Sequence, residues 1–177
     1  SGKTIKKVYS VSEWTVDAHG FFSDDDADDI SDNELFGYDF VEDDNGDIDT
    51  KSFALFGANS LSDIEEDSVV YVYASDDKIT RIEVGTEVHS GEVTRITTDD
   101  EYTIGGKVFK FAAQEDAKSY SSPKTKDEVK VYLDYAGDIY KCEKIKGEAE
   151  NYAVVLDVAD GAPGFAGEEP KINLFLA

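Results

Sequence analysis

Residues 69–84 read VVYVYASDDKITRIEV, and this stretch decides the fold class. The five residues from Val69 to Tyr73 are all β-branched or aromatic, which favours an extended strand. Ser75-Asp76-Asp77 supplies turn residues, and Lys78 to Val84 is again rich in strand formers. The stretch therefore predicts a strand that turns and returns. Because helical periodicity is nearly absent elsewhere, the chain as a whole is expected to be all-β.

Short β-rich runs separated by turn signals continue along the chain. Gly105-Gly106 lies between two such runs and predicts a tight hairpin, because glycine adopts the positive φ that a two-residue turn requires. Ala136-Gly137 marks a further hairpin in the same way. The remaining strands are expected at 91–97, 102–104, 107–111, 128–134, 138–144, 152–158 and 171–176.

The strands recur with a spacing of 60 residues, the separation of Val69 from Val129. Apolar residues 69, 71 and 73 match 129, 131 and 133, and residues 79, 82 and 96 match 139, 142 and 156. Residues 108–111 match 172–175 at a spacing of 64. Matching apolar positions at one spacing predict two copies of one supersecondary unit.

Comparison of the two copies also predicts which face of the strand is buried. Val70 and Val72 correspond to Lys130 and Tyr132, so this face tolerates charge. The face of residues 69, 71 and 73 is expected to point into the core. Two matched core positions, 79 and 82, lie three residues apart, which predicts a β-bulge that puts both on one face.

Three units follow from these matches: a divergent and incomplete β-unit at 1–62, and β-repeat units at 63–122 and 123–177. Each is expected to be a small β-barrel or β-sandwich of about five strands joined by hairpins. In the first unit, residues 4–8 resemble a return strand, and 37–41 and 52–56 resemble a closing hairpin around Asn45-Gly46. We expect the chain to begin inside a longer repeat array.

The charge of the chain restricts its partners. It has 17 Lys and Arg against 40 Asp and Glu, a net charge of −23. Such a polyanion repels phosphate backbones and anionic lipid surfaces, which argues against nucleic-acid binding. No apolar stretch approaches the roughly 20 residues that span a bilayer, so membrane insertion is not expected. The single Cys142 excludes an intrachain disulfide.

Several segments resemble a known class of surface proteins. Residues 128–139 (EVKVYLDYAGDI), 151–158 (NYAVVLDV) and 171–177 (KINLFLA) are similar to the repeat region of clostridial-type S-layer proteins, which are large and secreted and carry S-layer homology domains. The resemblance covers mainly residues 63–177. It implies an extracellular location in the cell wall or S-layer and a structural or spacer role. No S-layer homology domain is visible in the sequence itself.

Asp24, Asp26 and Asp28 form the most conspicuous candidate site, within the acidic run 24–29. Clustered carboxylates favour a hard cation such as Ca²⁺, and the alternate spacing resembles the start of an EF-hand loop. The expected glycine and the twelfth-position glutamate are missing, because Asp29 and Leu35 occupy those places. The cluster is therefore either a calcium site or a solvated loop.

Other residues that carry chemistry offer weaker signals. His19 and His89 each lie two residues from an acid, as a catalytic pair or a metal ligand would require, but the sequence favours exposed, inert histidines. Cys142 occupies a predicted core position and is expected to be a small buried hydrophobe. No pattern of a catalytic site or a phosphate loop occurs, so we do not expect an enzyme.

Aromatic residues concentrate in the first third of the chain. These residues are Trp14, Phe21, Phe22, Phe36, Tyr38, Phe40, Phe53 and Phe56. Two interpretations are open: the rings fill a core, or they form a surface on which sugar rings stack. The sequence thus favours a non-catalytic structural or spacer module of a secreted bacterial surface protein, whose partners are neighbouring repeats or surface-protein subunits. The alternative is a module that binds cell-wall glycan, with or without stabilisation by calcium.

Overall fold

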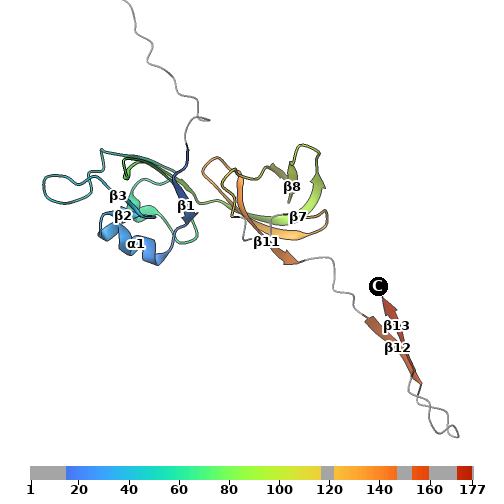
Figure 1. Ribbon diagram of the computed structural model, residues 1–177. Coiled ribbons are helices and arrows are strands. Elements are labelled where there is room, and N and C mark those ends of the chain that lie inside the picture. Colours follow the sequence, from blue (N-terminus) through green and yellow to red (C-terminus); the bar gives the residue numbers. More distant parts are fainter. Residues whose placement is uncertain (1–14, 117–121, 147–152, 160–170, 177) are drawn as a thin grey trace, which may run out of the picture. The chain divides into compact units, whose positions relative to one another are not determined.

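The computed structural model describes residues 15–116, 122–146, 153–159 and 171–176, and it shows a protein that is mostly β with one α-helix (Figure 1). The expectation of a β-protein is confirmed. The strands form a six-stranded sheet, a five-stranded sheet and a separate hairpin, and the described strands close no barrel. The return strand expected at 4–8, together with Trp14, lies outside the described residues.

The first sheet has the order β1-β5-β6-β3-β2, with β4 also paired to β6. The central strands β5 and β6 are antiparallel, and β3 and β4 run parallel to β6. Its strands are β1 (Ala18–Phe21), β2 (Glu34–Leu35), β3 (Tyr38–Asp39), β4 (Ala54–Phe56), β5 (Val69–Ser75) and β6 (Lys78–Gly85).

The second sheet has the order β11-β10-β7-β8-β9. Its strands are β7 (Val88–Ile96), β8 (Tyr102–Ile104), β9 (Lys107–Phe109), β10 (Glu128–Leu133) and β11 (Ile139–Lys146). Strands β12 (Ala153–Ala159) and β13 (Lys171–Leu176) pair antiparallel in a unit of their own. Each expected strand from residue 69 onward thus exists, with shifts of a few residues at its ends.

The predicted turns form as their residue types require. Gly105 and Gly106 both have positive φ, 54° and 86°, and join β8 to β9. Asp76 and Asp77 also have positive φ and join β5 to β6. Aspartate adopts this left-handed conformation more readily than most residues, which explains why two non-glycine residues are accommodated there.

The predicted β-bulge in β6 is confirmed. Tyr73 pairs with Arg81 and Ala74 with Ile79, so Thr80 is an extra residue without an opposite partner. The extra residue brings Ile79 and Ile82 to the same face, and both are fully buried.

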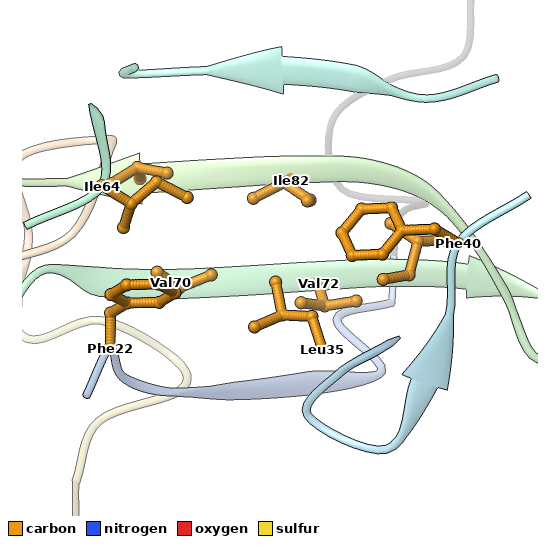
Figure 2. Close-up of a cluster of buried hydrophobic side chains, with 9 residues drawn as sticks. Phe22, Leu35, Phe40, Ile64, Val70, Val72 and Ile82 are labelled. Atoms are coloured by element: carbon orange, nitrogen blue, oxygen red, sulfur yellow. The ribbon is translucent and has the colours of Figure 1, made fainter. Parts of the chain in front are cut away.

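The buried face of β5 differs from the prediction. Val70 and Val72 are fully buried and pack with Ile82 in the first core, where Leu35 and Phe40 cover them (Figure 2). The face of residues 69, 71 and 73 is also buried, but in a different cluster. In β10 the matching residues 129, 131 and 133 do face the second core, as predicted.

A difference of one residue in the turn explains why the two copies use opposite faces. The first hairpin pairs Ser75 with Lys78 around two residues. In the second, the Asp134 amide bonds the Asp138 carbonyl around three residues, the last of which is Gly137 with a φ of 87°. A shift of one residue in strand pairing moves every side chain to the opposite face.

One helix, α1 (Asp24–Ser31), forms where a loop was expected, and it lies against β2 (Figure 1). Ser23 caps it: the Ser23 hydroxyl accepts from the Asp26 amide, and the Asp26 carboxylate accepts from the Ser23 amide. Acidic residues in the first turn also favour the helix, because they oppose its positive end. A serine followed three residues later by an acid is a local pattern from which this helix could have been predicted.

The closing hairpin expected in the first unit does not form as such. The turn at Asn45-Gly46 is present, and the Asp43 amide bonds the Asp47 carbonyl across it at 2.7 Å. However, the flanking strands β3 and β4 both pair with β6 rather than with each other. No described helix is long and apolar enough to cross a membrane.

Candidate functional site

The acidic residues predicted to bind metal lie on α1. Asp24 and Asp28 are one helical turn apart, whereas Asp26 lies between them on another face of the helix. The Asp26 carboxylate accepts a hydrogen bond from the Ser23 hydroxyl in the helix cap. Among the described residues, no group of three or more His, Cys, Asp or Glu side chains is arranged to hold a metal ion. The helix therefore spreads the three carboxylates instead of converging them.

The second acidic run is organised by its own backbone. Asp43 Oδ1 accepts hydrogen bonds from the amides of Asn45 and Asp47, at 2.8 and 3.2 Å. These backbone donors hold the pKa of the exposed Asp43 carboxyl below its usual range. The carboxylate thus stabilises the turn that contains Gly46.

The two histidines lie in different sheets and make different contacts. His19 Nδ1 lies 2.9 Å from the Tyr140 hydroxyl, and its ring meets Tyr71 and Tyr140 edge-on. His89 Nε2 lies 2.9 Å from the Ile104 carbonyl oxygen, and its ring packs beside Phe109. The acids two residues away in the sequence are not among these partners.

Cys142 lies fully buried in the second core, beside Val131 and Ile139. Burial, assisted by the charges of Asp127 and Glu143, raises the pKa of its thiol to about 12. A thiol that stays protonated at neutral pH is a poor nucleophile, so the environment fits a packing role.

The most extensive arrangement of polar and aromatic side chains joins the two sheets. We call it the aromatic seam, and it consists of Val69, Tyr71, Tyr73, Tyr132 and Tyr140, with Phe21 and Val16 packed against them. Strand β5 provides one side of the seam, and β10 and β11 provide the other. The ring of Phe21 lies edge-on to Tyr132 and Tyr140, at centroid distances of 5.1 and 5.3 Å.

Buried hydrogen bonds fix the seam at defined positions. The Tyr71 hydroxyl donates to Asp134 Oδ2 at 2.9 Å, from the first sheet to the turn of the second. The Tyr73 hydroxyl donates to Glu83 Oε2 at 3.0 Å within the first sheet, and Glu83 also pairs with Arg81. A buried polar group without a partner costs free energy, so these pairings select one arrangement of the sheets.

Burial and the neighbouring carboxylates raise the pKa of the seam tyrosines. Burial first, then the charge of Asp134, raises the pKa of Tyr71 well above its usual range. Burial and the bond to Glu83 raise the pKa of Tyr73 to about 12, and burial with the charge of Asp116 does the same for Tyr140. These hydroxyls therefore stay protonated at neutral pH, and those of Tyr71 and Tyr73 donate to carboxylates.

A shallow cleft borders the seam where β6 passes into β7. Its volume is about 400 Å³, and it is lined by Gly57, Val84, Gly85, Thr86, Glu87, Asp134, Tyr135, Ala136 and Gly137. Tyr135 lies 47% exposed on one wall, with its ring 5.9 Å from that of Phe56. Close backbone approach requires two of these glycines, since a Cβ on Gly57 would lie 1.9 Å from the Val84 carbonyl oxygen and one on Gly85 would lie 2.4 Å from the Leu133 carbonyl oxygen.

A second cavity of about 400 Å³ lies in the first sheet beside β4. Its lining residues are Thr50, Phe53, Leu55, Asn59, Ser60, Leu61 and Ser62. Of the aromatic residues singled out in the sequence, Phe22 and Phe40 are buried in the first core, and Phe36, Tyr38 and Phe53 pack against it. Core filling therefore accounts for most of them, and Phe53 also borders the cavity.

Sequence reasoning missed the seam, although residues 69–73 carried a signal for it. A run of five consecutive apolar residues is typical of a strand that is buried on both faces.

Comparisons with protein-family models, curated proteins and solved structures give no match for this chain.

Proposed function

We propose that the chain is a non-catalytic structural module of a secreted bacterial surface protein, in which small β-units follow one another and act as a spacer. The aromatic seam carries this proposal. It joins the sheets through buried rings and through the Tyr71–Asp134 hydrogen bond. A spacer requires such a contact, because units joined only by loose linkers would move independently.

Matching return strands support duplication of a β-unit. Ile79 and Ile82 of β6 are fully buried in the core of the first sheet. Their counterparts at the predicted spacing of 60, Ile139 and Cys142 of β11, are fully buried in the core of the second sheet. The agreement of these positions favours a common origin of the β5–β6 and β10–β11 hairpins.

The charge of the chain is compatible with an extracellular array. A net charge of −23 keeps the chain soluble and repels copies of itself. Divalent cations would bridge acidic surfaces of neighbouring units and reduce that repulsion. The resemblance of residues 63–177 to S-layer repeat regions favours the same location.

The rigidity of the seam can be tested by pulsed electron spin resonance with spin labels on Asp39→Cys in β3 of the first sheet and Lys107→Cys in β9 of the second. The buried Cys142 should not react with the label. We expect one narrow distance distribution, which broadens when Tyr71→Ala and Tyr140→Ala open the seam. A broad distribution in the parent chain would contradict the spacer role.

The location can be tested with antibodies against this chain, applied to cells of the organism that encodes it. Labelling of intact cells is expected. Labelling that requires permeabilised cells would exclude the surface location while leaving the seam measurement unaffected.

A further inference from the structure

The cavity beside β4 has a lining that differs from the rest of the chain. Charged residues make up 32% of the sequence, yet none of the seven lining residues is charged. Phe53, Leu55 and Leu61 provide apolar surface, and the others provide hydroxyl groups and one amide. An apolar wall with a few polar groups is the usual composition of a small-molecule site.

Packing holds the apolar wall of the cavity in place, and the Asp63 amide donates to the Ser60 carbonyl at 3.1 Å beside it. The ring of Phe53 lies 5.2 Å from that of the buried Phe40, so the apolar wall rests on the core. The short helix η2 (Leu61–Asp63) begins after Ser60, and the hydroxyls of Ser60 and Ser62 lie 2.9 Å apart. A wall formed before binding lowers the entropic cost of ordering it around a ligand.

We propose that this cavity binds one neutral pyranose ring of a glycan. A pyranose has an apolar face of C–H groups and a rim of hydroxyls, which match the Phe53 wall and the hydroxyl and amide groups. Its size suits a volume of about 400 Å³. This site does not depend on the spacer role, since all lining residues belong to the first sheet and its loops.

Other ligand classes fit the cavity less well. A hard metal ion would require carboxylates, and the lining provides none. An anionic sugar would approach a chain of net charge −23, with Asp49 and Asp63 adjacent in sequence to the lining residues. A purely apolar ligand would cover the hydroxyls of Ser60 and Ser62 without forming hydrogen bonds to them, which costs free energy.

The test is a titration of the full chain, observed through its backbone amide NMR signals. The probes are the neutral oligomers of glucose and of N-acetylglucosamine, with oligogalacturonate as an anionic comparison. At least one neutral oligomer should shift the signals of residues 50–62 with a Kd of about 1 mM or tighter, and oligogalacturonate should not. If no neutral oligomer shifts them at millimolar concentration, or if the anionic oligomer binds equally well, the proposal fails.

Matched variants locate the binding. Asn59→Ala combined with Ser62→Ala removes two polar groups from the rim and should weaken binding about 10-fold. The control, Asn45→Ala combined with Ser75→Ala, removes the same groups from a turn and a strand end outside the cavity and should leave the Kd unchanged. Equal affinity of both variants would overturn the assignment. Phe53→Leu should abolish binding while the amide signals of β5 and β6 report an intact sheet.

Discussion

At the scale of single residues, the tyrosines of the seam combine two properties that few side chains share. Their rings bury a large apolar area, and their hydroxyls still find acceptors inside the protein. Tyr71 reaches Asp134, whose other carboxylate oxygen accepts from the Asp138 amide at 2.9 Å. One aspartate therefore shapes the second hairpin turn and also binds the opposite sheet.

Replacing Tyr71 with phenylalanine should isolate the hydrogen bond from the packing. Tyr71→Phe leaves the ring in place but deprives a buried carboxylate of a donor, which should cost about 1–3 kcal/mol in the free energy of unfolding. Urea denaturation measures the change. Tyr135→Phe is the control, because that side chain is 47% exposed and its loss should stay within about 0.5 kcal/mol. Equal effects of both substitutions would show that the Tyr71–Asp134 bond contributes nothing specific.

The thiol of Cys142 should be protected by the fold. At pH 8 in native buffer a thiol reagent such as DTNB should react with less than a tenth of the chains over an hour, whereas in urea the reaction should be complete within minutes. Absorbance of the released thiolate provides the measurement. Rapid modification of the native chain would contradict the burial of this residue.

Alkaline pH should destabilise the fold through the buried phenols. Burial raises the pKa of Tyr140 to about 12, above the value of about 10 for a phenol in water, so its contribution is fully present below pH 10 and is lost as the pH rises through 12. Tyr140→Phe has no group to titrate there. The difference in unfolding free energy between the parent and Tyr140→Phe should therefore shrink between pH 9 and pH 11.5, measured in urea at constant ionic strength. A constant difference over this range would contradict the prediction.

At the scale of elements, turn chemistry and strand composition could be predicted from the sequence, because each depends on neighbouring residues. The Gly105-Gly106 turn and the bulge at Thr80 follow from local patterns. The buried faces of β5 could not be assigned, since a strand covered on both sides has no periodicity that distinguishes them. Among candidate site residues, the acidic run was visible, but the helix that separates Asp26 from Asp24 and Asp28 depends on the cap at Ser23.

The cavity beside β4 could be predicted only in part. Phe53 is one of the aromatic residues that the sequence offers for sugar stacking, whereas Asn59 and Ser62 lie at the end of the predicted unit 1–62 and carry no signal for a site. They line the cavity together with Leu55 of β4, a tertiary arrangement that no local pattern encodes.

Two glycines with nearly the same φ should differ greatly in their tolerance of alanine. Gly46 has a φ of 85°, and no atom lies near the position of a Cβ there. Gly46→Ala should therefore lower the free energy of unfolding only by the strain of a left-handed alanine, about 1–2 kcal/mol. Gly57 has a φ of 86°, and its Cβ would overlap the Val84 carbonyl oxygen. Overpacking should bring the cost of Gly57→Ala to about 2–5 kcal/mol. Thermal unfolding of the two variants provides the comparison, and equal melting temperatures would contradict the close approach at Gly57.

At the scale of the whole molecule, excess negative charge opposes the compact state, and salt should relieve it. Raising NaCl from low concentration to roughly 0.5 M should increase the melting temperature by screening like charges. CaCl₂ and MgCl₂ at equal ionic strength should raise it equally, because α1 directs Asp24 and Asp26 to different faces. A larger rise with Ca²⁺ that disappears in Asp24→Asn/Asp28→Asn would instead establish a calcium site on α1.

The second sheet draws its strands from both sides of the expected unit boundary near residue 122. Strands β7, β8 and β9 precede that boundary and β10 and β11 follow it, with Val131 of β10 paired to His89 of β7. During synthesis on a ribosome, residues 88–109 must therefore wait for some 20 to 40 further residues before their sheet can close. A chain truncated at residue 122 would therefore contain only β7, β8 and β9 of the second sheet. A chain truncated after residue 86 would contain all the strands of the first sheet.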